Sequence, residues 1–345
     1  MESGHFNYFR VKNFKRFRDL EVKDIGQFNL VLGDNNVGKT SLLEALMLEK
    51  KINIFSQSLN MRLLKRGIGN KVSDGIIGVY INSDAKLEQD EVSLELESNI
   101  YNHKILFDKV LKYTFHQPED GAFDIDRFIN DRDNDMNYSV DNKTDVVRHM
   151  DYFEPLITGL DKHDTQLTKQ YSKLIQSQSR HIKEKFIKEL RTVDSSILNL
   201  EVENVSTEQP LITIESSKQN SRVLLAFYGD GLIGIFRILL FIHLFKNKRL
   251  MIDEIDAGIY HDRMKEYWKV ILSSASENNV QLFATTHNRE CIKAYQEALE
   301  ELGDEFEEKS RTIRLVEHDQ SKDIVAFTSS YEKMVEELSI GNEVR

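Results

Sequence analysis

Cysteine and proline are both scarce in this sequence of 345 residues, and each scarcity excludes a class of protein. The single cysteine, Cys291, rules out an internal disulfide framework and a zinc site built from several thiolates. Only three prolines, together with plentiful aliphatic residues, exclude a collagen-like or disordered chain. One cysteine also suits a reducing compartment, so we expect a cytoplasmic protein.

Long apolar runs are missing as well. The longest, Leu232–Phe245, is interrupted by Arg237 and His243 and falls short of the roughly 20 residues that a bilayer span requires. We therefore interpret it as a buried helix. The first ten residues, MESGHFNYFR, lack the basic-then-apolar pattern of a secretory signal. The sequence thus predicts no association with a membrane.

Acidic residues outnumber basic ones by 57 to 46, which gives a formal net charge of −11 at pH 7. This balance argues against a protein that coats nucleic acid by charge alone. A local basic cluster nevertheless lies near the N-terminus. It fits three roles: contact with DNA, contact with phosphate at a nucleotide pocket, or a solvated strand edge. Its members are Arg10, Lys12, Lys15, Arg16 and Arg18, of which Lys15 and Arg16 are the candidates for phosphate contact.

The character of the chain changes twice along its length. Residues 1–52 and 222–290 are apolar and rich in motifs, and residues 291–345 form a charged, amphipathic tail. We assign residues 1–52 and 222–345 to two parts of one nucleotide-binding head, the second part including this tail. Residues 53–221 form a predicted α+β insertion. Within it we expect strands at Val92–Glu97, Lys104–Tyr113, Leu198–Val205 and Leu211–Ile214, and one long helix at Gln166–Leu190.

A glycine-rich phosphate-binding loop follows the predicted strand Phe28–Leu32 and precedes a predicted helix. Its glycines let the backbone wrap closely around phosphate, with N–H groups directed at the anion at the positive end of the helix. Lys39 adds a charge between the β- and γ-phosphates, and Thr40 offers a hydroxyl to Mg²⁺. The pattern G-x-x-x-x-G-K-[ST] is met by Gly33, Asp34, Asn35, Asn36, Val37, Gly38, Lys39 and Thr40, and Ser41 completes the expected nucleotide-binding set.

Two further predicted strands end in polar residues. The strand at 250–252 ends at Asp253 and Glu254, where Asp253 can hold the metal and Glu254 can act as general base toward the attacking water. The strand at 280–284 leads to His287, whose imidazole can bond the γ-phosphate or the attacking water. We therefore predict Glu254 and His287 as catalytic residues, and Thr40 with Asp253 as metal ligands.

A fourth motif, Gly229-Asp230-Gly231, opens the apolar helix that begins near Leu232. A glycine-flanked turn at a helix N-terminus is a second device for binding an anion. An ordinary turn and cap is the alternative on local grounds.

These four motifs, in this order, resemble the ABC-type ATPase heads of the SMC, RecF and OLD (overcoming lysogenization defect) superfamily. The closest likeness is to its small prokaryotic "AAA family ATPase" members. The resemblance covers about residues 6–50 and 222–345. It is carried by VKNFKRFRDLEV, FNLVLGDNNVGKTSLLEALML, YGDGLIGIFRILL, LMIDEIDAGIYHDRMKEYWKVI, VQLFATTHNRECIKAY and the ending GNEVR.

The resemblance implies an α/β P-loop head with a mixed sheet, interrupted by the α+β insertion, that uses ATP and Mg²⁺. It further implies a head-to-tail homodimer or larger homo-oligomer, in which Gly229-Asp230-Gly231 of one subunit meets the ATP held by the other. The family's signature begins with serine where this chain has Gly229. The turn at 256–258 corresponds to the family's dimer contact and His287 to its switch histidine, although Asn288 replaces the serine that commonly follows.

The biological role implied by this resemblance is an ATP-hydrolysing sensor or scaffold in a prokaryotic anti-phage system, working with a separate effector. Residues 288–345 are too few for the nuclease domain of OLD proteins, so any nuclease activity would come from a partner. The alternative is a RecF- or SMC-like DNA-binding ATPase in repair. A transporter ATPase is disfavoured because spanning helices and the serine-led signature are both missing.

Overall fold

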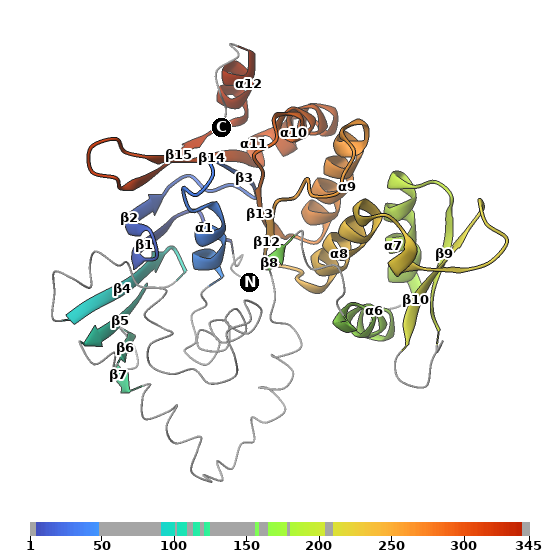
Figure 1. Cartoon of the computed structure of the whole chain (residues 1–345), viewed down its shortest axis with the longest axis horizontal. Coiled ribbons are helices and arrows are strands. Elements are labelled where there is room, and N and C mark those ends of the chain that lie inside the picture. The colour runs from blue at the N-terminus through green and yellow to red at the C-terminus, as the bar shows by residue number, and fades with distance from the viewer. Residues whose placement is uncertain are drawn as a thin grey trace, which may run out of the picture.

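The computed structural model describes residues 5–47, 91–100, 102–108, 113–117, 121–124, 156–158, 165–177, 180–203 and 210–339. These residues form three sheets with helices packed around the central one (Figure 1). Among the helices in these ranges, none is both long and apolar enough to cross a membrane.

The central sheet is mixed, as predicted. Five of its strands run parallel, and β15 pairs antiparallel with β14 at one edge. Strands β3 and β13 are buried along their whole length, which is typical of parallel strands covered on both faces. The strand order is β15 (Ile324–Ser329), β14 (Ser310–Glu317), β3 (Phe28–Leu32), β13 (Gln281–Thr285), β12 (Arg249–Asp253) and β8 (Leu156–Thr158).

Each face of the central sheet has its own apolar core. Alternation along the strands sends Val31 and Phe283 into one core, with helix α1 (Lys39–Leu46), and Leu30 and Leu282 into the other. The second core contains α8 (Asp230–Leu244), α9 (Met264–Glu277) and α10 (Arg289–Leu302). Consistent with this, Figure 1 shows α1 and α8 on opposite sides of β12 and β13. The apolar run assigned to a buried helix is confirmed as α8.

Strands from the middle of the chain complete both large sheets. The second sheet is antiparallel, and within it the N-terminal strand β1 pairs with β4, placing Phe9 opposite Ser98. Strand β8 pairs with β12 at the edge of the central sheet. The order in the second sheet is β2 (Phe17–Val22), β1 (Phe9–Phe14), β4 (Glu91–Ser98), β5 (Asn102–Asp108), β6 (Tyr113–Gln117) and β7 (Gly121–Asp124).

The third sheet consists of β9 (Ile197–Glu203), β10 (Leu211–Ser216) and β11 (Val223–Leu224), and it lies at the opposite end of the molecule from the second sheet (Figure 1). The third sheet has the order β11, β10, β9 and confirms the strands expected near 198 and 211, while the strand expected at 104–113 is two strands, β5 and β6. Four short helical elements complete the C-terminal part of the chain: η2 (Leu225–Phe227), η3 (His261–Arg263), α11 (Asp304–Lys309) and α12 (Tyr331–Ser339).

The prediction of a single helix at Gln166–Leu190 is wrong. Two helices occupy this stretch, α6 (Thr165–Ser177) and α7 (Arg180–Val193). The rings of Tyr171 and Phe186 lie 5.6 Å apart. In one straight helix, residues so far apart in sequence would be separated by about 22 Å. Each helix instead packs an aromatic ring against Phe236 of α8, with ring centroids 5.4 Å apart for Tyr171 and 5.1 Å apart for Phe186. Burial of both rings against Phe236 favours two separate helices over the single helix that the apolar periodicity indicated.

The Cys291 thiol should be unreactive toward thiol reagents in the folded protein. It lies on α10 with 1% of its surface exposed, and burial, together with the nearby Asp256 carboxylate, raises the pKa of its thiol to about 12. Because the thiolate is the reactive form, we expect no labelling by a thiol reagent at mildly alkaline pH in the native state, and complete labelling in guanidinium chloride. Rapid stoichiometric labelling of the native protein would contradict this packing of α10.

Candidate nucleotide site

The phosphate-binding loop joins β3 to α1 and depends on backbone conformations that side chains disfavour. Gly33, Asn36 and Gly38 have φ values of 141°, 70° and 104°. A Cβ on Gly33 would lie 2.6 Å from the Leu315 carbonyl oxygen, and one on Gly38 would lie 2.9 Å from the Phe17 ring. Both glycines are therefore required by conformation and by close packing. Gly38 also leaves the N-terminus of α1 without a side-chain cap, so its backbone N–H groups are available to an anion.

Lys39 lies across this loop. Its Nζ donates to the carbonyl oxygens of Gly33 and Asp34, at 2.6 and 3.0 Å. Partial burial lowers the pKa of Lys39, and the carboxylates of Asp253, Asp34 and Glu254 oppose that shift. The ammonium group is thus held at the mouth of the loop, where a phosphate chain bound to the backbone N–H groups would meet it.

The loop is tied to the sheet by a chain of hydroxyl and carboxylate groups. Thr40 Oγ1 donates to Asp253 Oδ2 at 2.8 Å, and Thr285 Oγ1 donates to Asp253 Oδ1 at 2.6 Å. Strands β12 and β13 are adjacent and parallel, so their carboxyl ends bring Asp253 and Thr285 together. Both oxygens of the Asp253 carboxylate are therefore fixed in front of the loop.

This arrangement fits Mg²⁺. A carboxylate and a threonine hydroxyl in direct contact are the hard oxygen donors that the ion prefers, with water and nucleotide phosphates completing its shell. Across the ranges that the structure describes, no cluster of three or more His, Cys, Asp or Glu side chains forms an all-protein metal cage. Thr40 and Asp253 are accordingly the residues that could hold the ion beside a bound nucleotide.

Glu254 leaves the strand in an uncommon backbone conformation. Its φ is 53°, and its backbone N–H donates to Thr285 Oγ1 at 2.8 Å. The following residue, Ile255, donates to the Thr285 carbonyl oxygen at 3.0 Å. A non-glycine residue with positive φ is uncommon and such residues cluster at functional sites. Thr285 thus positions Asp253 through its side chain and Glu254 through its main chain.

His287 is exposed just beyond the end of β13, beside the turn that follows Glu254. The two turns are joined by Thr286, whose hydroxyl donates to Asp256 Oδ1 at 2.7 Å. Asn288 caps α10 by accepting from the Glu290 N–H at 2.9 Å. Asparagine is a strong capping residue, which accounts for its presence at this position.

The turn Gly229-Asp230-Gly231 packs against the turn that follows Glu254. Gly229 is the N-cap of α8, and Gly231 lies so close to Gly258 that a Cβ on Gly231 would be 2.9 Å from the Gly258 carbonyl oxygen. Gly258 has a φ of 77° and itself approaches Asp230. By contrast, a Cβ on Gly229 would meet nothing within 4 Å. Gly231 is therefore a packing residue, while Gly229 faces open space.

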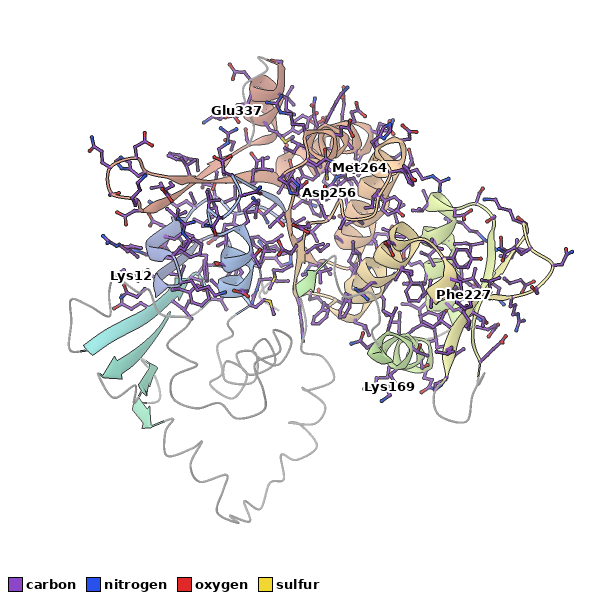
Figure 2. The ribbon with its side chains drawn as sticks, viewed as in Figure 1. Lys12, Lys169, Phe227, Asp256, Met264 and Glu337 are labelled. Carbon is purple, nitrogen blue, oxygen red and sulfur yellow. The ribbon has the colours of Figure 1, made fainter. Side chains whose placement is uncertain are left out.

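The basic cluster at the N-terminus is neutralised by carboxylates. Figure 2 shows Lys12 at the opposite end of the molecule from Phe227, on the strands of the second sheet. The Arg16 guanidinium also donates to the carbonyl oxygen of Asn36, so the β1–β2 turn touches the phosphate-binding loop. The ion pairs are Arg10–Asp19 at 2.5 Å, Lys12–Glu95 at 3.0 Å, Lys15–Glu44, Arg16–Glu317 at 2.6 Å and Arg18–Asp323 at 3.7 Å.

Two residues of the site were missed by sequence reasoning. Thr285 was seen only as part of a polar strand end, although it bonds both Asp253 and Glu254. Phe17 closes over Gly38 from the neighbouring sheet. Thr285 could have been selected from the polar residues of ATTH at the strand end, whereas the sequence around Phe17 carries no signal for its contact.

This fold and this loop define a P-loop ATPase head. The fold matches solved heads of SMC proteins: an SMC head bound to the C-winged helix domain of ScpA has a TM-score of 0.60 at 11% identity, over 95% of this chain and 99% of that one. An SMC head with an extended coiled coil, bound to the C-terminal domain of ScpA derived from Pyrococcus furiosus, has a TM-score of 0.57 at 10% identity, over 97% and 99%. At these identities the likeness shows the fold alone.

The sequence places the chain more narrowly. Residues 28–291, more than half of the chain, match the family described as "AAA domain, putative AbiEii toxin, Type IV TA system", and the protein belongs to that family. A Helicobacter pylori protein named "ATP/GTP phosphatase" is 23% identical over 90% of this chain and 92% of its own length. The chain is thus an ATPase of the AAA/SMC-like class, as the sequence motifs predicted.

Proposed function

We propose that this protein is a cytoplasmic ATP-driven switch, which binds ATP with Mg²⁺, converts it to ADP and phosphate, and assembles with further copies through its nucleotide sites. The observation that carries this proposal is the continuous contact from Thr40 through Asp253 to Thr285, with Glu254 held beside it. That contact joins a phosphate-binding loop to two carboxylates of the kind that ATP hydrolysis requires.

Each residue has a definite part in this chemistry. The loop N–H groups and Lys39 bind the phosphates, while Thr40 and Asp253 would hold the ion, which neutralises charge on the phosphates when bound. Glu254 accepts a proton from the attacking water as general base. His287, at the adjacent strand end, would bond the γ-phosphate or that water.

Assembly would be head to tail, with Gly229-Asp230-Gly231 (the signature turn) of one copy facing the ATP held by the other. Two features support this. Gly229 faces open space at the start of α8, so a second molecule can approach its backbone N–H groups closely. Phe227, two residues earlier, has 78% of its surface exposed, and exposed aromatic residues are enriched in protein interfaces.

Substitution at Gly229 tests this geometry. Gly229→Arg should leave ATP binding to a copy's own loop intact but abolish hydrolysis and ATP-dependent association, because the long side chain fills the space that the other copy must enter. Gly229→Ala is the matched control and should retain both, since its φ of −63° is ordinary and its Cβ meets no neighbour. Gly231 is unsuitable, because any side chain there would displace Gly258. Normal turnover by Gly229→Arg would make the turn a helix cap only.

For the biological role, we favour a sensor or scaffold ATPase in a prokaryotic anti-phage system that acts with a separate effector, such as a nuclease. The family description names a toxin of a toxin–antitoxin system, and this supports a role in defence against phage. Co-expression with the neighbouring genes and phage challenge would test it: protection that is lost in Glu254→Gln supports the role, and growth of phage unaffected by the intact set opposes it.

A DNA-clamping ATPase is the second candidate, favoured by the likeness to SMC heads. The ion pairs of the N-terminal cluster weigh against it, because a cation already paired with a carboxylate gains less from a phosphate. Binding to duplex DNA at several salt concentrations separates the two. A steep fall in affinity with salt would support the DNA-binding function, whereas weak and nearly salt-independent binding would support the switch.

A further inference from the structure

A hollow of about 650 Å³ lies directly beside the signature turn. Its walls include Gly229 and Gly231 of the turn, Gly258 of the turn after Glu254, and Tyr260 and Arg263 around the short helix η3. Gly229 has no side chain, and Gly231 is packed against Gly258. Side-chain contacts from this side of the molecule must therefore come from the other residues around the hollow.

Arg263 is the arginine that lines this hollow, and it is held only loosely. It is exposed, and its Nη1 donates to the carbonyl oxygen of Val193 at a long 3.4 Å. Across the described ranges, no carboxylate forms an ion pair with it. Three acids line the hollow, Asp194, Asp230 and Asp262. Two of them have donors of their own: Asp194 accepts from Ser196 and Lys218, and Asp262 lies 2.7 Å from His261 Nε2. Arg263 thus keeps guanidinium donors for a bidentate contact with an anion, because it has five N–H groups and makes one long hydrogen bond.

Tyr260 supplies an aromatic surface on the same turn. The backbone N–H of Arg263 donates to the Tyr260 carbonyl oxygen at 3.0 Å, so the two residues begin and end one tight turn. Tyr260 has 81% of its surface exposed, the largest value among the exposed large hydrophobic side chains of the described residues. Tyrosine is enriched at interfaces, where its ring packs against a partner while its hydroxyl stays in contact with water. A guanidinium group beside an exposed aromatic ring is suited to binding a nucleotide. The guanidinium can contact the phosphates, and the aromatic ring can pack against the base or the ribose.

We propose that Arg263 contacts the phosphates of the ATP bound in the loop of a second copy, and that Tyr260 packs against the base or ribose of the same nucleotide. This inference rests on the head-to-tail assembly proposed above. It identifies the side chains near the signature turn of one copy that contact the ATP bound by the other copy. The hollow beside Gly229 gives the nucleotide room to approach both residues.

The test uses the full chain with Arg263→Ala, Arg263→Lys, Tyr260→Ala and Tyr260→Phe. Arg263→Ala should lower turnover at saturating ATP about 10- to 100-fold, as expected for loss of a charge-assisted contact, and should weaken ATP-dependent association. Binding of ATP to the variant's own loop, measured by calorimetry, should be unchanged. Arg263→Lys and Tyr260→Phe should lose less than the alanine variants. Arg222→Ala is the control, because it removes an exposed arginine that pairs with Glu203 outside the hollow.

Mixing variants decides between a contact across the interface and a role within one copy. Arg263→Ala has an intact loop, and Lys39→Ala has an intact Arg263, so a mixed pair contains one complete site if Arg263 acts across the interface. Activity recovered on mixing supports the proposal. Turnover by Arg263→Ala that equals wild type, or a defect that mixing does not relieve, overturns it while leaving the ATPase assignment standing. Failure of the wild-type protein to associate with ATP would overturn both this proposal and the assembly on which it rests.

Discussion

Lys39→Ala should bind ATP at least about 100-fold more weakly than the wild-type protein, because two charge-assisted contacts to phosphate are lost together. Within the loop, Lys39 Nζ donates to the carbonyl oxygens of Gly33 and Asp34, which hold it where the phosphates would bind. Calorimetry with ATP and Mg²⁺ measures the effect directly. A thermal melt without nucleotide controls for folding, and Lys309→Ala provides a lysine control remote from the loop in sequence.

In the same experiment, added ATP should raise the melting temperature of the wild type and of Lys309→Ala but leave that of Lys39→Ala unchanged. An ATP affinity equal to that of the wild type would show that Gly33 to Ser41 do not form the phosphate site, and the ATPase mechanism proposed for this chain would fail with it.

Glu254→Gln should keep ATP binding and lose turnover by about 100-fold or more, since the substitution preserves shape and removes the general base. The φ of 53° at this position and the N–H bond to Thr285 should persist, because both depend on the main chain. Phosphate release at saturating ATP is the measurement. Glu290→Gln is the matched control, being an exposed glutamate in the first turn of α10. Wild-type turnover in Glu254→Gln would make Glu254 a structural residue.

The parts of the site that could be predicted from sequence are local. A buried strand, a glycine loop and a helix occur within residues 28–46, and each has its own pattern of apolar residues and glycines. The strands that end at Asp253 and Thr285 could likewise be predicted from short apolar runs. These elements form wherever their local pattern agrees with the burial of the parallel sheet.

The parts that could not be predicted depend on contacts between distant segments. Thr285 joins Asp253 to Glu254 because β12 and β13 are adjacent in the sheet. The sequence of neither strand alone indicates which strand will be its neighbour. The packing of Gly231 against Gly258 has the same origin. The break between α6 and α7 follows from a shared contact with Phe236, which overrides a helical pattern that continues through both. Pairing of the basic cluster with carboxylates also arises only once the sheets are assembled.

The most direct test of the proposed switch is the native mass of Glu254→Gln with and without ATP and Mg²⁺. Because this variant should bind ATP without consuming it, ATP should raise its mass from that of the nucleotide-free form to an assembly containing at least two chains of 40.2 kDa. Lys39→Ala should show no such change. A mass of Glu254→Gln that stays the same when ATP is demonstrably bound would contradict assembly through shared nucleotide sites.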